Sequence, residues 1–225
     1  MRVATNKRDD ALGKEKVNDV LEDTGERVIP DNMNILNELL IEHIARYHFS
    51  ASYAKGRILD FASGTGYGTH IIAKRRKAHI DEIVGVDIDR ATIEYARATY
   101  YHPLSSFVQG DVTDPAIVKQ LGMFDVILSF ETIEHIHEEE QFMDNIFSML
   151  KPGGTLIIST PFGKGRGIPS GQEFHVHQLK PSEFKALFTQ YKDVQYYGQK
   201  SALIEPADFP TDVLTHPLGI AVCRK

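Results

Sequence analysis

The chain has 225 residues, a length at which one domain buries a substantial core without disulfides or structural metals. Its 25 basic residues are outnumbered by 31 acidic ones, and the formal charge of -6 disfavours a nucleic-acid backbone as the main partner. The single cysteine, Cys223, excludes an internal disulfide, and the lack of a membrane-length apolar run and of a signal peptide predicts a cytoplasmic protein.

The N-terminal part of the chain is predicted to contain a flexible segment followed by a helix. Residues 1 to about 25 are charged and poorly patterned, so we expect the N-terminal segment, residues 1–30, to be partly flexible. From Asn32 to Phe49, apolar residues recur at helical spacing, which predicts an amphipathic helix. We therefore expect a single domain over residues 31–225, with this helix as its N-terminal cap.

After that helix, the chain alternates between short β-rich runs and helical stretches. The predicted strands are 57–61, 82–87, 106–109, 124–130 and 155–160, and the predicted helices between them are 67–77, 90–100, 115–121 and 138–150. A helix at 181–191 then precedes two more strands, 194–197 and 219–223, whose connecting loop fits an antiparallel pairing. The predicted fold class is α/β, with a doubly wound, mostly parallel sheet of seven strands and an antiparallel last strand.

The most specific pattern is the run 57–68, in which an apolar strand ends in Asp60 and leads into three alternating glycines. A strand that leads through such a turn into a helix brings bare backbone N–H groups against a polar ligand. The dinucleotide fingerprint G-x-G-x-x-G has a different spacing, and here Thr69 occupies the place of its third glycine. A carboxylate at the strand tip would repel a pyrophosphate and would favour a ligand that carries an amine or another cation.

The sequence Leu59-Asp60-x-x-x-Gly64-x-Gly66 resembles the first motif of the class I S-adenosylmethionine-dependent methyltransferases. The resemblance implies a Rossmann-like fold, S-adenosylmethionine as the cofactor, and a turn that wraps the methionine part of this cofactor. The cofactor-binding residues expected from the motifs and strand tips are Arg27, Asp60, Ala62, Gly64, Gly66, Tyr67, Asp87, Ile88, Asp111, Val112 and Phe130.

Each strand tip contributes a different expectation. Asp87 lies about 20 residues beyond the glycine turn, the spacing at which an acid accepts hydrogen bonds from a ribose diol, whereas Asp89 is expected to cap the next helix. The resemblance assigns Asp111 to the adenine amino group and Val112 to the ring face. Arg27, just ahead of the first helix, is expected to clamp the carboxylate of the cofactor.

The end of the fourth strand carries Glu131, Glu134 and His135. If Glu131 opens a helical turn, the other two share its face. One interpretation is catalytic: His135 takes the proton of an acceptor hydroxyl while a carboxylate orients its ring. The pattern Glu-x-x-Glu-His also resembles ubiquinone-biosynthesis O-methyltransferases and small-RNA 2′-O-methyltransferases, which implies Mg²⁺ or Mn²⁺ held by Glu131, Glu134, His135 and His175. A third interpretation is structural, with Glu134 capping the turn and His135 packed under the cofactor.

Two downstream segments are expected to face the acceptor. The loop after residue 160 carries Lys164 and Arg166, which could contact an acidic acceptor or could belong to a mobile, solvated loop. His175 and His177 point to the same side if their segment is extended.

The predicted function is methyl transfer from S-adenosylmethionine to a small-molecule acceptor, at an oxygen such as a sugar or natural-product hydroxyl. The acceptor class depends on residues 24–30, which resemble the start of bacterial methyltransferases linked to sugar, polysaccharide or natural-product modification. The alternatives are a metal-assisted O-methyltransferase, including one for RNA 2′-hydroxyls, an NAD-binding oxidoreductase, and a noncatalytic cofactor-binding module. The sequence is compatible with a homodimer and predicts no membrane partner.

Overall fold

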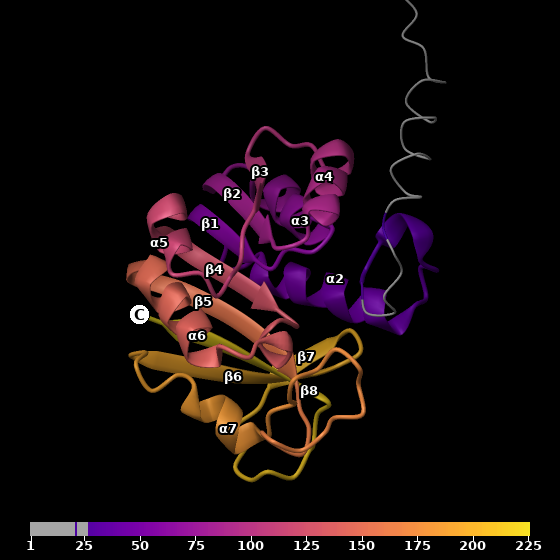
Figure 1. Cartoon of the computed structure of the whole chain (residues 1–225), viewed down its shortest axis with the longest axis vertical. Coiled ribbons are helices and arrows are strands. Elements are labelled where there is room, and N and C mark those ends of the chain that lie inside the picture. The colour runs from indigo at the N-terminus through magenta and orange to yellow at the C-terminus, as the bar shows by residue number, and fades with distance from the viewer. Residues whose placement is uncertain (1–20, 22–26) are drawn as a thin grey trace, which may run out of the picture.

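The computed structural model describes residue 21 and residues 27–225; residues 1–20 and 22–26, most of the predicted N-terminal segment, lie outside the described residues. One sheet organises the chain, with helices on both of its faces (Figure 1). Its eight strands have the order β3-β2-β1-β4-β5-β8-β6-β7. Their bounds are β1 Gly56–Phe61, β2 Ile80–Asp87, β3 Ser105–Gln109, β4 Phe124–Phe130, β5 Leu150–Pro161, β6 Asp193–Lys200, β7 Leu203–Pro206 and β8 Leu218–Arg224.

The sheet confirms the α/β prediction and corrects its strand count. Strands β1 to β5 pair in parallel, and β8 pairs antiparallel with both β5 and β6, as expected for a reversed last strand. The seven predicted strands are all present. The eighth, β7, forms a hairpin with β6 at the sheet edge, where a short, largely exposed strand needs no apolar alternation.

The helices divide between the two faces of the sheet. Helices α2, α3 and α4 pack on one face and α5, α6 and α7 on the other (Figure 1). The α-helices are α2 Glu38–Ser50, α3 Tyr67–Arg76, α4 Arg90–Thr99, α5 Ala116–Leu121, α6 Glu139–Met149 and α7 Pro181–Ala186, with the 3-10 turns η1 Pro30–Asn32 and η2 Ile133–His135. No helix in the described part of the chain is long and apolar enough to cross a membrane.

Two helices differ from their predicted bounds by more than one residue. α2 begins at Glu38 rather than Asn32, because the Asn37 side chain accepts a hydrogen bond from the backbone N–H of Leu40 and caps the helix there. Ile35, which fits the helical period, is 80% exposed in the preceding turn. α7 ends at Ala186, so the predicted helix 181–191 continues only as turns.

The strand order determines where a ligand can bind. Order reverses between β1 and β4, and in such sheets the crevice at the reversal lies beyond the carboxyl ends of the strands. The predicted residues that follow β1, β2, β3 and β4 therefore lie at one edge. Residues 126–128 of β4 are fully buried on both faces, so the core keeps this edge in place.

Candidate active site

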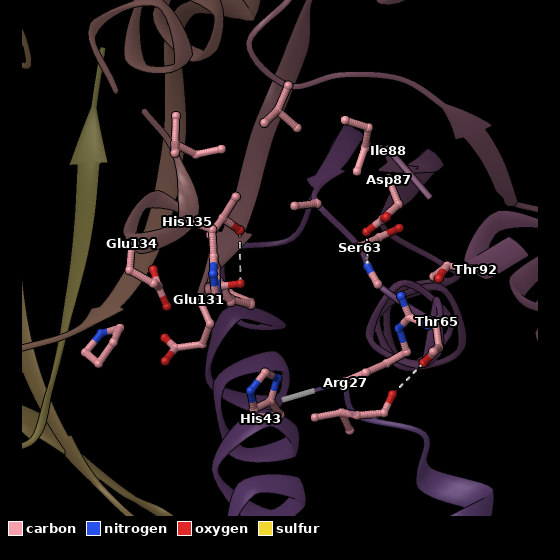
Figure 2. Close-up of a pocket in the computed structure, with 18 of the residues that line it drawn as sticks. Arg27, His43, Ser63, Thr65, Asp87, Ile88, Thr92, Glu131, Glu134 and His135 are labelled. Carbon is pink, nitrogen blue, oxygen red and sulfur yellow. Dashed lines mark hydrogen bonds between the residues drawn. The ribbon is translucent and has the colours of Figure 1, made fainter. Parts of the chain in front are cut away.

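A cavity of about 710 Å³ lies at the carboxyl ends of β1 to β4, a size within the range of cofactor and substrate sites. Figure 2 shows its two sides: Ser63, Thr65, Asp87 and Ile88 on one, and Glu131, Glu134 and His135 on the other. The predicted site residues that line it are Arg27, Ala62, Gly64, Tyr67, Asp87, Ile88, Asp111, Val112, Phe130, Glu131, Glu134, His135 and His175. The predicted site residues that do not line it are Asp60, Gly66, Lys164, Arg166 and His177.

The glycine turn carries left-handed backbone at alternate positions. Ala62, Gly64 and Gly66 have φ angles of +71°, +54° and +85°. A Cβ on Gly64 would meet nothing within 4 Å, whereas one on Gly66 would lie 2.6 Å from the Phe107 ring. Gly64 therefore leaves open space beside the cavity, and Gly66 allows the start of α3 to pack against β3. Gly66 does not line the cavity, so its predicted contact with the cofactor stays a prediction.

Asp60 has a different position from the one predicted. Alternation along β1 turns its side chain to the same face as Ile58, towards α2 and α3, and it is 1% exposed. Its carboxylate accepts hydrogen bonds from Thr69 Oγ1 at 2.6 Å and from the Tyr47 hydroxyl at 3.2 Å. Burial raises its pKa to about 7. Asp60 therefore joins the two helices to β1 and lies outside the cavity, so the expected contact with a cationic ligand is not supported.

At the end of β2, two acids have separate tasks. Asp87 accepts the backbone N–H of Gly64 at 2.9 Å and that of Asp89 at 3.0 Å, and burial raises its pKa. Asp89 caps α4 by accepting from the backbone N–H of Ala91, which confirms its predicted role. Its carboxylate also pairs with Arg27 at 3.0 Å, and this ion pair joins the segment that begins at Arg27 to the start of α4.

The acidic side of the cavity departs from the predicted helical face. Glu131 has φ of +49° and precedes η2, so it opens no helical turn. Its carboxylate accepts a hydrogen bond from Ser159 at 2.7 Å, and that of Glu134 accepts one from Thr160 at 3.1 Å. Glu134 is 1% exposed, and burial followed by the charge of Glu131 raises its pKa well above the ordinary value. Two carboxylates therefore meet at the cavity, although they do not share a helix face.

His135 and His175 complete this side. Nδ1 of His135 lies 2.9 Å from the backbone carbonyl of Phe174, and because a carbonyl only accepts, Nδ1 carries the proton and Nε2 the lone pair. The two imidazole rings lie 4.8 Å apart. Ligand atoms of Glu134, His135 and His175 lie within 4.8 Å of one another. This donor set of one carboxylate and two imidazoles suits a divalent metal, and Glu131 is not part of it.

The loop after β5 places its charged residues elsewhere. Arg166 pairs with Glu139 at the start of α6 at 2.6 Å, and Lys164 is exposed outside the cavity. Nε2 of His177 lies 3.3 Å from a carboxylate oxygen of Glu139 in a separate hollow. Thus Lys164, Arg166 and His177 do not face the cavity, contrary to expectation. His175 and His177 diverge because the segment is irregular rather than extended.

Several residues that line the cavity were not predicted. His43 and Tyr47 come from α2, one helical turn apart, and Nδ1 of His43 lies 2.9 Å from the Tyr67 hydroxyl. Their i, i+4 spacing on the apolar face of the predicted helix was a usable signal. Gln172 and Gln178 belong to the irregular loop, where no pattern marked them.

The sequence is similar to those of S-adenosylmethionine-dependent methyltransferases. A probable S-adenosylmethionine-dependent methyltransferase from Mycolicibacterium smegmatis is 32% identical over 169 residues, covering 73% of this chain and 62% of that protein. A ubiquinone biosynthesis O-methyltransferase from Chelativorans sp. is 31% identical over 135 residues, covering 58% and 51%. The chain therefore spans less than two thirds of the length of these curated relatives.

The fold also matches solved structures. The N-methyltransferase NodS from Bradyrhizobium japonicum, in complex with S-adenosyl-L-homocysteine, aligns with a TM-score of 0.60 at 16% identity, covering 94% of this chain and 97% of that one. At the level of sequence, the family described as "Methyltransferase domain" matches residues 53–208. These residues include the glycine turn, the tips of β2 to β4 and the histidine pair, and the chain belongs to the methyltransferase domain family.

Proposed function

We propose that this chain binds S-adenosylmethionine at the carboxyl ends of β1 to β4 and transfers its methyl group to a small-molecule hydroxyl. The observation that carries the proposal is one cavity with two chemically different sides. One side is built from the glycine turn and the tips of β2 and β3. The other presents two carboxylates and two imidazoles, which are groups that bind and deprotonate an acceptor.

The first side suits the cofactor. Oxygens of Asp87 each accept one backbone N–H, and their remaining lone pairs can accept a ribose diol. Ile88, 64% exposed, and the buried Val112 offer apolar contact to an adenine ring, and Asp111 beside them can accept from its amino group. Gly64 has room for a ligand to approach the backbone. When bound, the sulfonium of S-adenosylmethionine supplies an electrophilic methyl carbon.

The second side suits the acceptor. Nε2 of His135 carries the lone pair in the neutral ring, so it can take the proton of an acceptor hydroxyl whose oxygen would receive the methyl group. The products are the methyl ether, S-adenosylhomocysteine and a proton held on His135. The task of the remaining groups is to orient the acceptor and exclude water.

Isothermal titration with S-adenosylhomocysteine and with NAD⁺ tests the cofactor assignment. We expect the first to bind and the second not to bind. Asp87→Asn should weaken S-adenosylhomocysteine by about tenfold or more, because it replaces a charged acceptor of the ribose hydroxyls. The matched control is Asp81→Asn, at the exposed start of the same strand. Binding of NAD⁺ alone, or equal affinity of both variants, would contradict the assignment.

A metal-assisted reaction is the second candidate, and the cluster of Glu134, His135 and His175 supports it. A divalent ion held there would lower the pKa of an acceptor hydroxyl, and His135 would then be a ligand rather than the base. Release of S-adenosylhomocysteine with a panel of hydroxyl acceptors provides the assay. Stripping with EDTA should abolish turnover and Mg²⁺ or Mn²⁺ should restore it; full turnover after stripping favours His135 as the base.

A further inference from the structure

His43 on α2 lines the cavity, yet the chemistry above gives it no role. In Figure 2 its ring lies between Arg27 and the group formed by Glu131, Glu134 and His135. Its Nδ1 contacts the hydroxyl of Tyr67, which is the first residue of α3 after the glycine turn. His43 therefore lies beside the N-terminus of α3.

The contact with Tyr67 is the basis for assigning which nitrogen of His43 carries the proton. Burial raises the pKa of Tyr67, so its hydroxyl keeps the proton and can donate it. Within the described residues, this hydroxyl has Nδ1 of His43 as a hydrogen-bond partner, and we assign the hydroxyl as the donor and Nδ1 as the acceptor, which places the ring hydrogen on Nε2. Burial also lowers the pKa of His43, which keeps the ring neutral. His43 is thus a neutral donor, whereas Nε2 of His135 is an acceptor.

Three features at this place favour an anionic group on a ligand. The N-terminus of α3, a helix of ten residues, carries partial positive charge. Arg27 lines the same cavity as a second cationic group, although the Asp89 carboxylate already pairs with its guanidinium at 3.0 Å. Nε2 of His43 adds an N–H donor. The carboxylate of the methionine part is the anionic group of S-adenosylmethionine.

We propose that His43 is a further cofactor-binding residue whose Nε2–H donates a hydrogen bond to the methionine carboxylate of S-adenosylmethionine, with Tyr67 as the positioning residue that sets its tautomer. This inference rests on the proposed function. It divides the histidines of the cavity by role: His43 holds the methyl donor, and His135 serves the acceptor.

Two ligands that differ in the amino-acid part test the proposal. S-adenosylhomocysteine carries the carboxylate, whereas 5′-methylthioadenosine lacks the whole amino-acid part. In isothermal titrations, His43→Ala should weaken the first by about tenfold or more and change the second by less than about twofold. The control is His48→Ala, an exposed histidine on the same helix, which should change neither. Tyr67→Phe should weaken S-adenosylhomocysteine by less than His43→Ala does, because the freed ring still samples the donor tautomer.

The remaining outcomes each overturn the proposal in a recognisable way. Equal losses for both ligands in His43→Ala would mean general damage to the cavity rather than a lost carboxylate contact. Unchanged affinity for S-adenosylhomocysteine with reduced turnover would place His43 on the acceptor. If the unaltered protein bound neither ligand, the proposed function would itself be wrong.

Discussion

Gly66 in the glycine turn is the position where a single added carbon has the clearest expected effect. Its φ of +85° lies in the left-handed region, and a Cβ there would lie 2.6 Å from the Phe107 ring and 2.8 Å from Cβ of Ala96. Left-handed backbone costs alanine about 1–2 kcal/mol, and overpacking costs about 1–3 kcal/mol. We expect Gly66→Ala to lower the free energy of unfolding by about 2–5 kcal/mol.

Gly153→Ala separates the two terms. Gly153 has φ of +73°, but a Cβ there would meet nothing within 4 Å, so this variant bears the backbone cost alone. Urea denaturation followed by circular dichroism, with linear extrapolation, gives the free energy of unfolding of each variant. The difference between them measures the packing cost against β3 and α4. Equal destabilisation of the two variants would refute the view that packing requires glycine at Gly66.

Three further predictions concern charge and access. Because burial raises the pKa of Asp60 to about 7 from 3.8, its contribution to stability is present below the unfolded pKa and lost as the pH rises through about 7. In urea denaturation, the free energy of unfolding of Asp60→Asn should therefore not show the decrease that the unaltered protein shows between about pH 4 and pH 7. If the free energies of unfolding of the two proteins changed in parallel with pH, the prediction would be wrong. Arg166→Gln breaks a partly exposed ion pair that joins the loop after β5 to Glu139 of α6. Because exposed Phe174 lies in the same loop, we expect chymotrypsin to cut after Phe174 up to about fivefold faster in this variant. Lys164→Gln should leave that rate unchanged, and equal rates in both variants would count against the ion pair. The buried thiol of Cys223, whose pKa burial raises, should react with Ellman's reagent only in denaturant; rapid reaction in native buffer would contradict its burial.

Most of the sheet could be predicted because its strands are buried on both faces. Runs such as 126–128 are apolar throughout, and their alternation with helices fits a parallel sheet. β7 could not be predicted, since Leu203–Pro206 is a short edge strand that is largely exposed. The start of α2 was predicted too early because Ile35 fits the spacing of apolar residues in a helix. That spacing carries no information about the cap at Asn37, which sets the first residue of the helix.

The cavity could be predicted in part, because the carboxyl ends of parallel strands meet at one edge. Asp87 and Val112 line it for that reason. The position of Asp60 depended on which face of β1 it occupies, and its spacing of two from Ile58 held that information. His177 diverges from His175 because of an irregular backbone that local sequence does not specify. The identity of the acceptor, the metal, the homodimer and the cytoplasmic location stay predictions.

The position of β8 has a consequence for the order of folding. β8 is the last of the eight strands along the chain, yet it lies inside the sheet between β5 and β6 (Figure 1). During synthesis, β1 to β5 emerge first and leave the edge of β5 open, and the β6–β7 hairpin has no neighbour in the described sheet other than β8. Until β8 has been synthesised, the parallel strands β1 to β5 therefore have an unpaired edge at β5, and an unpaired edge favours association between nascent chains. When β8 pairs with both β5 and β6, it covers that edge and joins the β6–β7 hairpin to the parallel strands in one step.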